Sequence, residues 1–393
     1  MTRGRPSLRL KRGHDTPRSH PWIFKGDVAE VSDVEPGSEV TVIDSAGRFV
    51  GRGLYNPRPG LCCRILTWTD EPLDAAFFRR QLARALALRA RGQAQPPALC
   101  RLVWSEADGL PGLVVDRYGF VLVMQCLTLG MSRLRPTIVE ALTGLFGDVQ
   151  VFDMDEEASA RLEGFSASRG WAHGSGPRSV RVNEGGVGFD VTIGVGHKTG
   201  LYLDQRENRA RVGALARDRD VLDAFSYTGG FACHALRGGA RRAVCIESSP
   251  DAIAGARQNL ALNGVAARAE ILTTNAFDEL RRLERTGARF GVIVLDPPPF
   301  ARNRSAIDAA ARGYKEINLR ALRCLRPGGL LATFSCSHHV SPALFEDVCR
   351  AATEDVGRPV RVASPLGQAR DHPVLLAVPE TRYLTGLLLE ILE

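Results

Sequence analysis

Hydrophobic and polar positions follow a β-type pattern in the first part of the chain. Short stretches rich in β-branched and aromatic residues alternate there with glycine and proline turns. Strands are therefore expected at 22–24, 39–44, 47–54 and 61–68, and this arrangement predicts a small barrel or sandwich. A helix is expected over 77–91, where arginines at helical spacings are interpreted as a solvated face.

The middle of the chain mixes strand and helix patterns. Strands with a turn at 109–112 are expected over 101–127, followed by a helix over 132–146 and a short strand at 187–193. A loop is expected at 92–97. A second loop is expected over 165–180, because this segment is rich in glycine and serine.

From position 204 onward, apolar strands alternate with helical stretches. The expected strands are 221–225, 243–247, 269–273, 292–295 and 330–334. The expected helices follow Gly229 and cover 250–263, 276–285, a long stretch ending at 325, and 342–353. This alternation is typical of βαβ units and of a mostly parallel sheet covered on both faces. The last apolar runs, 374–378 and 383–392, are expected to pair antiparallel at the sheet edge.

The composition is that of an ordinary globular protein. The 393 residues are 44% hydrophobic and 24% charged, so two or three domains are expected. Apolar runs fall short of the ~20 residues that span a bilayer, and the N-terminus lacks the apolar segment of a signal peptide, which predicts a soluble cytoplasmic protein. The nine cysteines show neither a Cys-x-x-Cys pair nor zinc spacing, so free, mostly buried thiols and no metal site are expected.

The positive charge is concentrated at the start of the chain. The net charge is +7, and residues 1–25 contain seven basic residues and one acid, which gives +6. Such a segment fits contact with a polyanion such as RNA, while a solvated tail is the alternative interpretation.

Polar residues follow the ends of the expected parallel strands. The first strand leads into the turn 223–231, where glycines allow close approach of a ligand to the backbone and a helix N-terminus offers free N–H groups. Glu247 ends the second strand, at the place of a ribose-binding carboxylate. The alternative, that Glu247 caps the next helix, is disfavoured because Ser249 and Pro250 already fit the cap and first turn.

The later strand ends carry the residues expected to act on a substrate. Asn275 follows the third strand and is expected to contact adenine, to cap the next helix, or both. Asp296 follows the fourth strand and precedes three prolines, which form a stiff loop able to hold a flat base against one polar group. Cys336 follows the fifth strand among hydroxyls and histidines, so it is a candidate nucleophile, with an inert half-buried thiol as the alternative.

Six segments together resemble one family of class I S-adenosylmethionine-dependent methyltransferases. The sequence is most similar to the ribosomal large-subunit methyltransferase I family, whose members methylate carbon 5 of a cytosine in 23S rRNA. The segments are 20–24, 105–112, 196–206, 225–231, 296–298 and 335–337. The resemblance implies an α/β protein with an N-terminal RNA-binding PUA domain (1–75), a central α+β domain (76–190) and a Rossmann-like methyltransferase domain (191–393).

The resemblance also implies which residues bind the cofactor. The turn around Gly229 is expected to hold the methionine part, Glu247 the ribose and Asn275 the adenine side, with Arg206 a candidate partner of the cofactor carboxylate. The competing interpretation at this last point has Asp204 capping a helix. The full expected set is Gln205, Arg206, Phe225, Ser226, Tyr227, Gly229, Glu247, Ser248, Asn275, Ala276 and Asp296.

Two positions depart from the family pattern. The family usually has an acid where Asn275 stands, and it usually has lysine where Pro299 stands. The first departure affects the expected adenine contact, and the second removes a basic contact to RNA.

The expected reaction is methyl transfer through a cysteine adduct. Carbon 5 of cytosine is a poor nucleophile, so addition of the Cys336 thiolate to carbon 6 would activate it, with a protonated Asp296 held at ring nitrogen 3 and the exocyclic amine. The sequence marks no base for the carbon 5 proton. The expected partner is RNA, specifically 23S rRNA, and no association with a membrane is expected. The oligomeric state is left open, and a homodimer is one option.

Two other functions remain open at this point. One is methylation of an exocyclic or ring nitrogen, because Asp-Pro-Pro-aromatic loops serve amine methylation, although Phe300 comes one place late here. The other is a non-catalytic RNA-binding ribosome-assembly factor, against which the intact Gly229, Glu247 and Asp296 argue.

Overall fold

The computed structural model describes residues 5–13, 20–92, 96–194, 199–301 and 303–392. The described chain forms two compact units. The first unit contains the residues up to Val182 together with Val191–Leu203 and Arg370–Thr381. The second contains Asn183–Asp190, Asp204–Ala369 and the residues from Arg382 onward. Among the described residues, helices are too short or too polar to cross a membrane.

The first unit begins with a six-stranded sheet, as the β-type pattern predicts. Its strands lie in the order β2-β6-β5-β4-β1-β3. Their bounds are β1 Ser7–Leu10, β2 Trp22–Phe24, β3 Val28–Val31, β4 Glu39–Ile43, β5 Phe49–Tyr55 and β6 Leu61–Thr67. Alternate residues such as Leu8, Leu10, Val40 and Val42 fill its core. Strands β1 and β3 were not predicted. Each is only four residues long, and β1 pairs with β4 and β3, so these strands are stabilised by partners that the local sequence does not show.

A second sheet in this unit has the order β11-β10-β9-β8-β7. Its strands are β7 Leu99–Trp104, β8 Leu113–Tyr118, β9 Val121–Cys126, β10 Gln150–Met154 and β11 Arg169–His173. The helices of this region are α1 Ala75–Arg89, α2 Leu129–Arg133, α3 Arg135–Phe146 and α4 Glu157–Glu163. Helix α1 was predicted, and the predicted helix at 132–146 is present but interrupted at Leu134, between α2 and α3.

The predicted loop over 165–180 is wrong. Strand β11 lies within it and pairs antiparallel with β10. Trp171 packs edge-on against Phe152 of β10, with 5.1 Å between ring centroids. Pairing and packing with β10 outweigh the local glycine and serine content. The hairpin of β12 (Ser179–Glu184) and β13 (Val187–Thr192) follows, and β13 was predicted.

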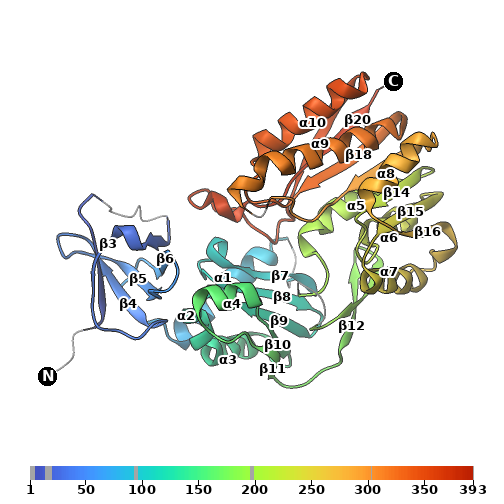
Figure 1. The fold of residues 1–393 in the computed structure, drawn as a ribbon. Coiled ribbons are helices and arrows are strands. Elements are labelled where there is room, and N and C mark those ends of the chain that lie inside the picture. Colours follow the sequence, from blue (N-terminus) through green and yellow to red (C-terminus); the bar gives the residue numbers. More distant parts are fainter. Residues whose placement is uncertain (1–4, 14–19, 93–95, 195–198, 302, 393) are drawn as a thin grey trace. The chain divides into compact units, whose positions relative to one another are not determined.

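The second unit has the predicted alternation of strands and helices (Figure 1). Its seven-stranded sheet has the order β16-β15-β14-β17-β18-β20-β19. The strands are β14 Asp220–Ala224, β15 Arg242–Glu247, β16 Ala269–Thr273, β17 Phe290–Leu295, β18 Leu325–Ser335, β19 Val360–Gly367 and β20 Thr385–Ile391. Strands β14 to β18 are parallel, and β20 runs antiparallel to both β18 and β19. This is the expected α/β class, with a mostly parallel sheet.

Six helices accompany this sheet within the described residues. They are α5 Arg206–Leu215, α6 Gly230–Arg237, α7 Pro250–Leu262, α8 Ala276–Arg285, α9 Ile307–Arg323 and α10 Pro342–Val356. Helices α8, α9 and α10 pack side by side in sequence order, and α5, α6 and α7 form a second such group (Figure 1).

The edge of the sheet differs from the prediction. The run 383–392 does contain an antiparallel strand, β20, but its outer partner is β19 rather than 374–378. The run 374–378 forms only an isolated bridge between Leu375 and Val378 and belongs to the first unit. Leu376 in this run is 89% exposed, so apolar character alone did not predict burial.

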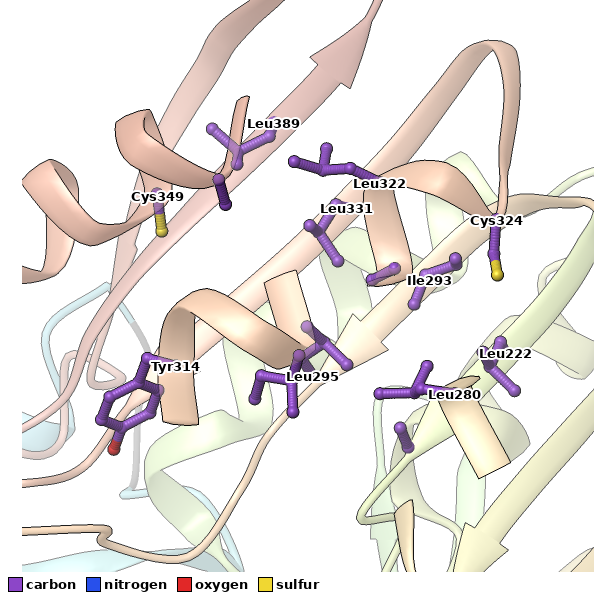
Figure 2. Close-up of a cluster of buried hydrophobic side chains, with 14 of the residues drawn as sticks. Leu222, Leu280, Ile293, Leu295, Tyr314, Leu322, Cys324, Leu331, Cys349 and Leu389 are labelled. Atoms are coloured by element: carbon purple, nitrogen blue, oxygen red, sulfur yellow. The ribbon is translucent and has the colours of Figure 1, made fainter. Parts of the chain in front are cut away.

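A continuous apolar core fixes the strand ends of the second unit. Side chains of β14, β17, β18 and β20, among them Leu222, Ile293 and Leu331, pack against α8, α9 and α10 (Figure 2). Burying one such side chain contributes ~1.5–3 kcal/mol relative to leaving it exposed. The residues that follow these strands are therefore held on a rigid support.

Candidate active site

The carboxyl ends of four parallel strands lie next to each other in register. Ala224 of β14 pairs with Ile246 of β15 on one side and with Leu295 of β17 on the other, and Leu295 pairs with Thr333 of β18. Glu247 is the last residue of β15, and Asp296 and Cys336 directly follow β17 and β18. In open parallel sheets, ligands bind in the crevice at this edge.

The turn after β14 has an unusual backbone. Phe225 and Tyr227 have φ angles of 62° and 47°, and Gly229 has a φ of 74°. A non-glycine residue in this left-handed region costs ~1–2 kcal/mol, so surrounding contacts must hold the turn. The Ser226 N–H donates to the Ile246 carbonyl at 3.0 Å, and the Gly229 N–H donates back to the Ser226 carbonyl at 2.8 Å.

Gly229 brings the turn close to a neighbouring helix and starts helix α6. A Cβ atom at this position would lie 3.3 Å from the Cβ of Ala256 on α7, and its positive φ would be strained. As the N-cap, Gly229 offers no side chain to the first helical N–H groups. These donors make the helix N-terminus suited to an anionic or polar ligand group.

Asp223 is a buried acid below this turn that the sequence analysis did not assign. Its Oδ2 accepts from the Ala232 N–H in the first turn of α6 at 3.0 Å. Its Oδ1 is buried without a protein partner. Burial raises the pKa of Asp223 to about 7, although the Ala232 N–H acts in the opposite direction. A ligand that brings a positive charge or a donor would satisfy this carboxyl group.

We expect Asp223→Asn to stabilise the ligand-free protein at alkaline pH. From about pH 4 to pH 7 the unfolded carboxyl ionises while the folded one keeps its proton, so the wild type loses stability as pH rises and the loss is complete above pH 7. The variant lacks this loss. Its free energy of unfolding in urea should exceed the wild-type value by roughly 1–3 kcal/mol at pH 8.5, with the difference vanishing or reversing near pH 4.

Asp220 on the same strand provides the control. Burial acts to raise its pKa, but hydrogen bonding and charge from Arg241, together with Arg242 and Arg326, lower the pKa below its usual value. Asp220→Asn should therefore destabilise the protein at pH 8.5. The same sign for both variants would contradict the account of Asp223.

Glu247 is held in one orientation by backbone donors. Its Oε2 accepts from the Tyr227 N–H at 2.9 Å, and its Oε1 accepts from the N–H groups of Ser248 and Ser249 at 2.8 and 2.9 Å. A carboxylate has about four acceptor positions, so this arrangement leaves capacity for a ligand hydroxyl. Ser249, as predicted, is the cap of α7 and accepts from the Ala252 N–H.

Asn275 and the aromatic residues beside it follow the next strand. The Asn275 side-chain oxygen accepts from the Phe277 N–H at 2.9 Å, which confirms the predicted helix cap. Phe277 lies 6.4 Å from Phe225 and 5.6 Å from Phe300, measured between ring centroids. An adenine contact by Asn275 or Ala276 stays a prediction.

Asp296 is oriented by a chain of amides that begins at a backbone carbonyl. The Gly367 carbonyl accepts from Asn208 Nδ2 at 2.8 Å, and the same nitrogen donates to Gln205 Oε1 at 2.6 Å. Gln205 is thereby turned so that its Nε2 donates to Asp296 Oδ1 at 2.9 Å. This chain fixes Oδ1 of Asp296 as an acceptor.

Cys336 differs from the other cysteines, as the sequence predicted. Eight of the nine are buried, whereas Cys336 is half-buried, and all nine are free thiols. Burial raises the pKa of Cys233 and of Cys349 to about 12 each, so these thiols are inert near neutral pH. The Cys336 S–H donates to the Pro297 carbonyl at 3.7 Å, which places the thiol against the loop that begins at Asp296.

Other residues that the sequence singled out flank those described above. Arg206 begins α5 and is half-buried, while Ser248 is exposed. His338 and His339 are exposed, and the ring of His338 lies 6.0 Å from that of Tyr383. The Tyr383 hydroxyl donates to Asp204 at 2.6 Å, and Gln205 rather than Asp204 is the N-cap of α5.

The segment 196–206 is only partly described. Residues 195–198, including Gly196, lie outside the described residues. Thr199 donates to Asp116 at 2.5 Å and contacts the Tyr118 hydroxyl at 3.1 Å in the first unit. Gln205, at the other end, belongs to the second unit and contacts Asp296.

The residues at this edge fit the sulfonium cofactor that the sequence resemblance implies. An unsatisfied buried carboxyl oxygen on Asp223 suits a donor or cation, and helix α6 offers N–H groups to an anion. The remaining acceptor position of Glu247 suits a ribose hydroxyl, and the aromatic rings of Phe225 and Phe277 offer apolar surface. The sequence analysis missed Asp223, Asn208 and Tyr314; only Asp223 stood in a segment already singled out, at the end of the first strand.

Comparison with known proteins gives a consistent picture. Residues 160–358 match the family profile described as S-adenosylmethionine-dependent methyltransferase, and residues 8–68 match a PUA-like domain. A protein of Alteromonas mediterranea named ribosomal RNA large subunit methyltransferase I is 40% identical over 98% of this chain and 98% of its own. A protein of the same name from Klebsiella pneumoniae (strain 342) is 40% identical over 97% of each chain.

Solved structures support the fold. A methyltransferase crystallised in complex with SAH superposes with a TM-score of 0.84 at 18% identity, over 98% of this chain and 99% of its own. A SAM-dependent methyltransferase from Streptococcus mutans superposes with a TM-score of 0.83 at 17% identity, over 98% and 99%.

Proposed function

The chain belongs to the S-adenosylmethionine-dependent methyltransferases of the ribosomal RNA large subunit methyltransferase I family, and we propose that it methylates carbon 5 of a cytosine in 23S rRNA through a cysteine adduct. The observation that carries this proposal is the pairing of Cys336 with the Asp296 loop. A half-buried thiol contacts the loop whose acid is fixed by Gln205, at the sheet edge that fits the cofactor.

The cofactor-binding residues are proposed from the same edge. When bound, S-adenosylmethionine supplies an electrophilic methyl group. The turn of Phe225, Ser226, Tyr227 and Gly229 holds its methionine part, and Glu247 with Ser248 holds the ribose. Asn275 and Ala276 border the adenine, while Gln205, Arg206 and Asp296 form the remaining wall, with Arg206 facing the cofactor carboxylate.

The two proposed catalytic residues, Cys336 and Asp296, act on different atoms of the same cytosine ring. The Cys336 thiolate forms a bond to carbon 6, and the displaced electron pair moves through the ring toward nitrogen 3. Asp296 gives a proton to nitrogen 3 and accepts from the exocyclic amine, so charge does not accumulate on the ring. Carbon 5 becomes enamine-like and takes the methyl group. Carbon 5 then loses its proton to solvent, the electron pair of that bond forms the carbon 5–carbon 6 double bond, and the Cys336 sulfur leaves as thiolate. Nitrogen 3 returns its proton to Asp296, which restores both the aromatic ring and the acid.

The first unit is proposed to bind the RNA. The match to a PUA-like domain over 8–68 and the excess of basic residues at the start of the chain support this role. We retain the limits 1–75, 76–190 and 191–393 for the PUA, central and catalytic domains. A target inside an RNA helix must be turned out of its stack before Cys336 reaches it. We propose that the reaction takes place in the cytoplasm, because ribosomal RNA is the proposed substrate.

Mapping the modified base tests the proposal directly. The rRNA of cells with and without the gene is digested and compared by mass spectrometry, and purified protein is then used to restore the modification. A 5-methylcytidine that depends on the gene is expected. A methylated exocyclic or ring nitrogen would establish the alternative chemistry, and unmethylated RNA with intact RNA binding would establish a non-catalytic role.

Two ring contacts of Phe300 disfavour the nitrogen alternative. Amine methylation of the Asp-Pro-Pro-aromatic type uses an aromatic ring stacked on the substrate. Phe300 packs instead on Tyr314, with ring centroids 4.5 Å apart, and on Phe277.

A further inference from the structure

We propose that the hydroxyl of Tyr314 positions Cys336 by clamping the two serines that flank it. The proposal rests on the proposed role of Cys336 as the nucleophile. Tyr314 is a positioning residue here: its hydroxyl contacts Ser335 and Ser337, and no direct contact with a base is invoked.

Tyr314 lies in α9 and reaches the turn after β18. Its hydroxyl accepts from the Ser335 hydroxyl at 3.0 Å and lies 3.0 Å from the Ser337 Oγ. The Ser337 N–H in turn donates to the Ser335 Oγ at 3.4 Å. Residues on both sides of Cys336 are thus tied to one oxygen atom.

The same network reaches the loop that begins at Asp296. The Ala301 N–H donates to the Ser337 Oγ at 3.3 Å. The Cys336 S–H donates to the Pro297 carbonyl, at the opposite end of the loop. The clamp therefore links the turn that carries the thiol to the loop that carries the acid, and it sets the separation of the two groups that must address one pyrimidine.

The three side chains of the clamp are shielded from solvent and held in one geometry. Tyr314, Ser335 and Ser337 are each at most 2% exposed. A buried hydroxyl without a partner costs ~1–3 kcal/mol, so this geometry is strongly preferred over alternatives. Burial raises the pKa of Tyr314, which keeps its proton on the oxygen.

The aromatic ring of Tyr314 is fixed independently of its hydroxyl. It lies 4.5 Å from Phe300 and 5.5 Å, edge-on, from Phe345. Figure 2 shows Tyr314 at the margin of the apolar cluster, with its oxygen directed away from the labelled aliphatic side chains. Removing the oxygen alone should therefore preserve the packing and release only the two serines.

Tyr314→Phe separates positioning from folding. The rate of adduct formation with RNA carrying 5-fluorocytidine is measured with saturating S-adenosylmethionine, together with the cofactor Kd, the RNA KM and the melting temperature. We expect the adduct rate and kcat to fall together by about 10–100-fold, because small misplacements of reacting groups cost up to ~10²-fold. The cofactor Kd and the RNA KM should change by less than about twofold, since the clamp contacts neither ligand.

Tyr118→Phe is the matched control. The Tyr118 hydroxyl is equally buried and has two partners, Thr199 and the Leu201 carbonyl. All three residues lie in the first unit, whereas Tyr314 lies in the second. Tyr118→Phe should lower the melting temperature about as much as Tyr314→Phe does, without slowing adduct formation. Ser335→Ala with Ser337→Ala should reproduce the Tyr314→Phe defect, and adding Tyr314→Phe to this pair should cause no further loss.

The outcomes distinguish this proposal from the function on which it rests. A wild-type adduct rate in Tyr314→Phe overturns the clamp, and so does an equal loss of cofactor affinity, because the role would then be general folding. If Tyr314→Phe does not fold, Ser337→Ala alone must slow the adduct for the clamp to stand. Failure of wild-type protein to form an adduct overturns the proposed mechanism itself, and the clamp with it.

Discussion

Replacing Cys336 by alanine is expected to abolish methyl transfer while leaving the cofactor bound. The nucleophile splits one difficult step into two, so its loss should lower kcat by on the order of 10³-fold or more. The side chain is only half-buried at the sheet edge and carries no part of the apolar core, so folding should be unaffected. The measurements are single-turnover methylation of rRNA and S-adenosylmethionine binding by calorimetry.

A second cysteine and a modified substrate make this test specific. Cys324→Ala removes a buried thiol after α9, in the apolar core of the second unit, and should retain wild-type activity with a small loss of stability. Wild-type protein should form a stable complex with RNA that carries 5-fluorocytidine, and Cys336→Ala should not. Full activity in Cys336→Ala would end the covalent mechanism.

Substitutions of Asp296 should reveal whether its proton, and not only its shape, is needed. Asparagine can donate to nitrogen 3 through its amide and accept from the exocyclic amine, as a protonated acid does, but it has no proton to give up. Asp296→Asn is therefore expected to keep the RNA KM and lose roughly 10²–10⁴-fold in kcat, the range of general acid catalysis. Asp296→Ala should lose at least as much in kcat and raise the KM.

The hydrogen bond from Gln205 can form both in the wild type and in Asp296→Asn, so the two proteins can be compared directly. Gln205 Nε2 donates to Oδ1, and the oxygen of an asparagine can still accept this bond. An exposed acid in α9, Asp308, provides the control, and Asp308→Asn should have wild-type kinetics. Equal kcat for wild type and Asp296→Asn would limit Asp296 to binding the base.

Local pattern determined most of the second unit. Helix α8 has the predicted bounds, and β15 and α7 agree with the prediction to within one residue. These elements were predictable because their periodicity and their caps, Ser249 and Asn275, lie within one segment of chain. Cys336 was singled out for the same reason, as a cysteine just beyond an apolar strand.

Some elements depended on partners that local pattern does not show. Strands β1 and β11 are stabilised by pairing with β4 and β10. Strand β19 has no buried residue and was missed, whereas the apolar run 374–378 was predicted as a strand and is not one. Whether a segment joins a sheet depends on the edge available to it, and the chain reveals that edge only when folded.

The sequence by itself determined the alternation of strands and helices from β14 to α10, the α/β class and the polar residues at the strand ends. Only the tertiary structure decided how those residues are held. Gln205 and Asp296 lie 91 positions apart, and Tyr314 reaches Ser335 across 21. A hydrogen bond requires its two atoms to lie within about 3 Å, a condition set by packing between elements and absent from the spacing of residues along the chain.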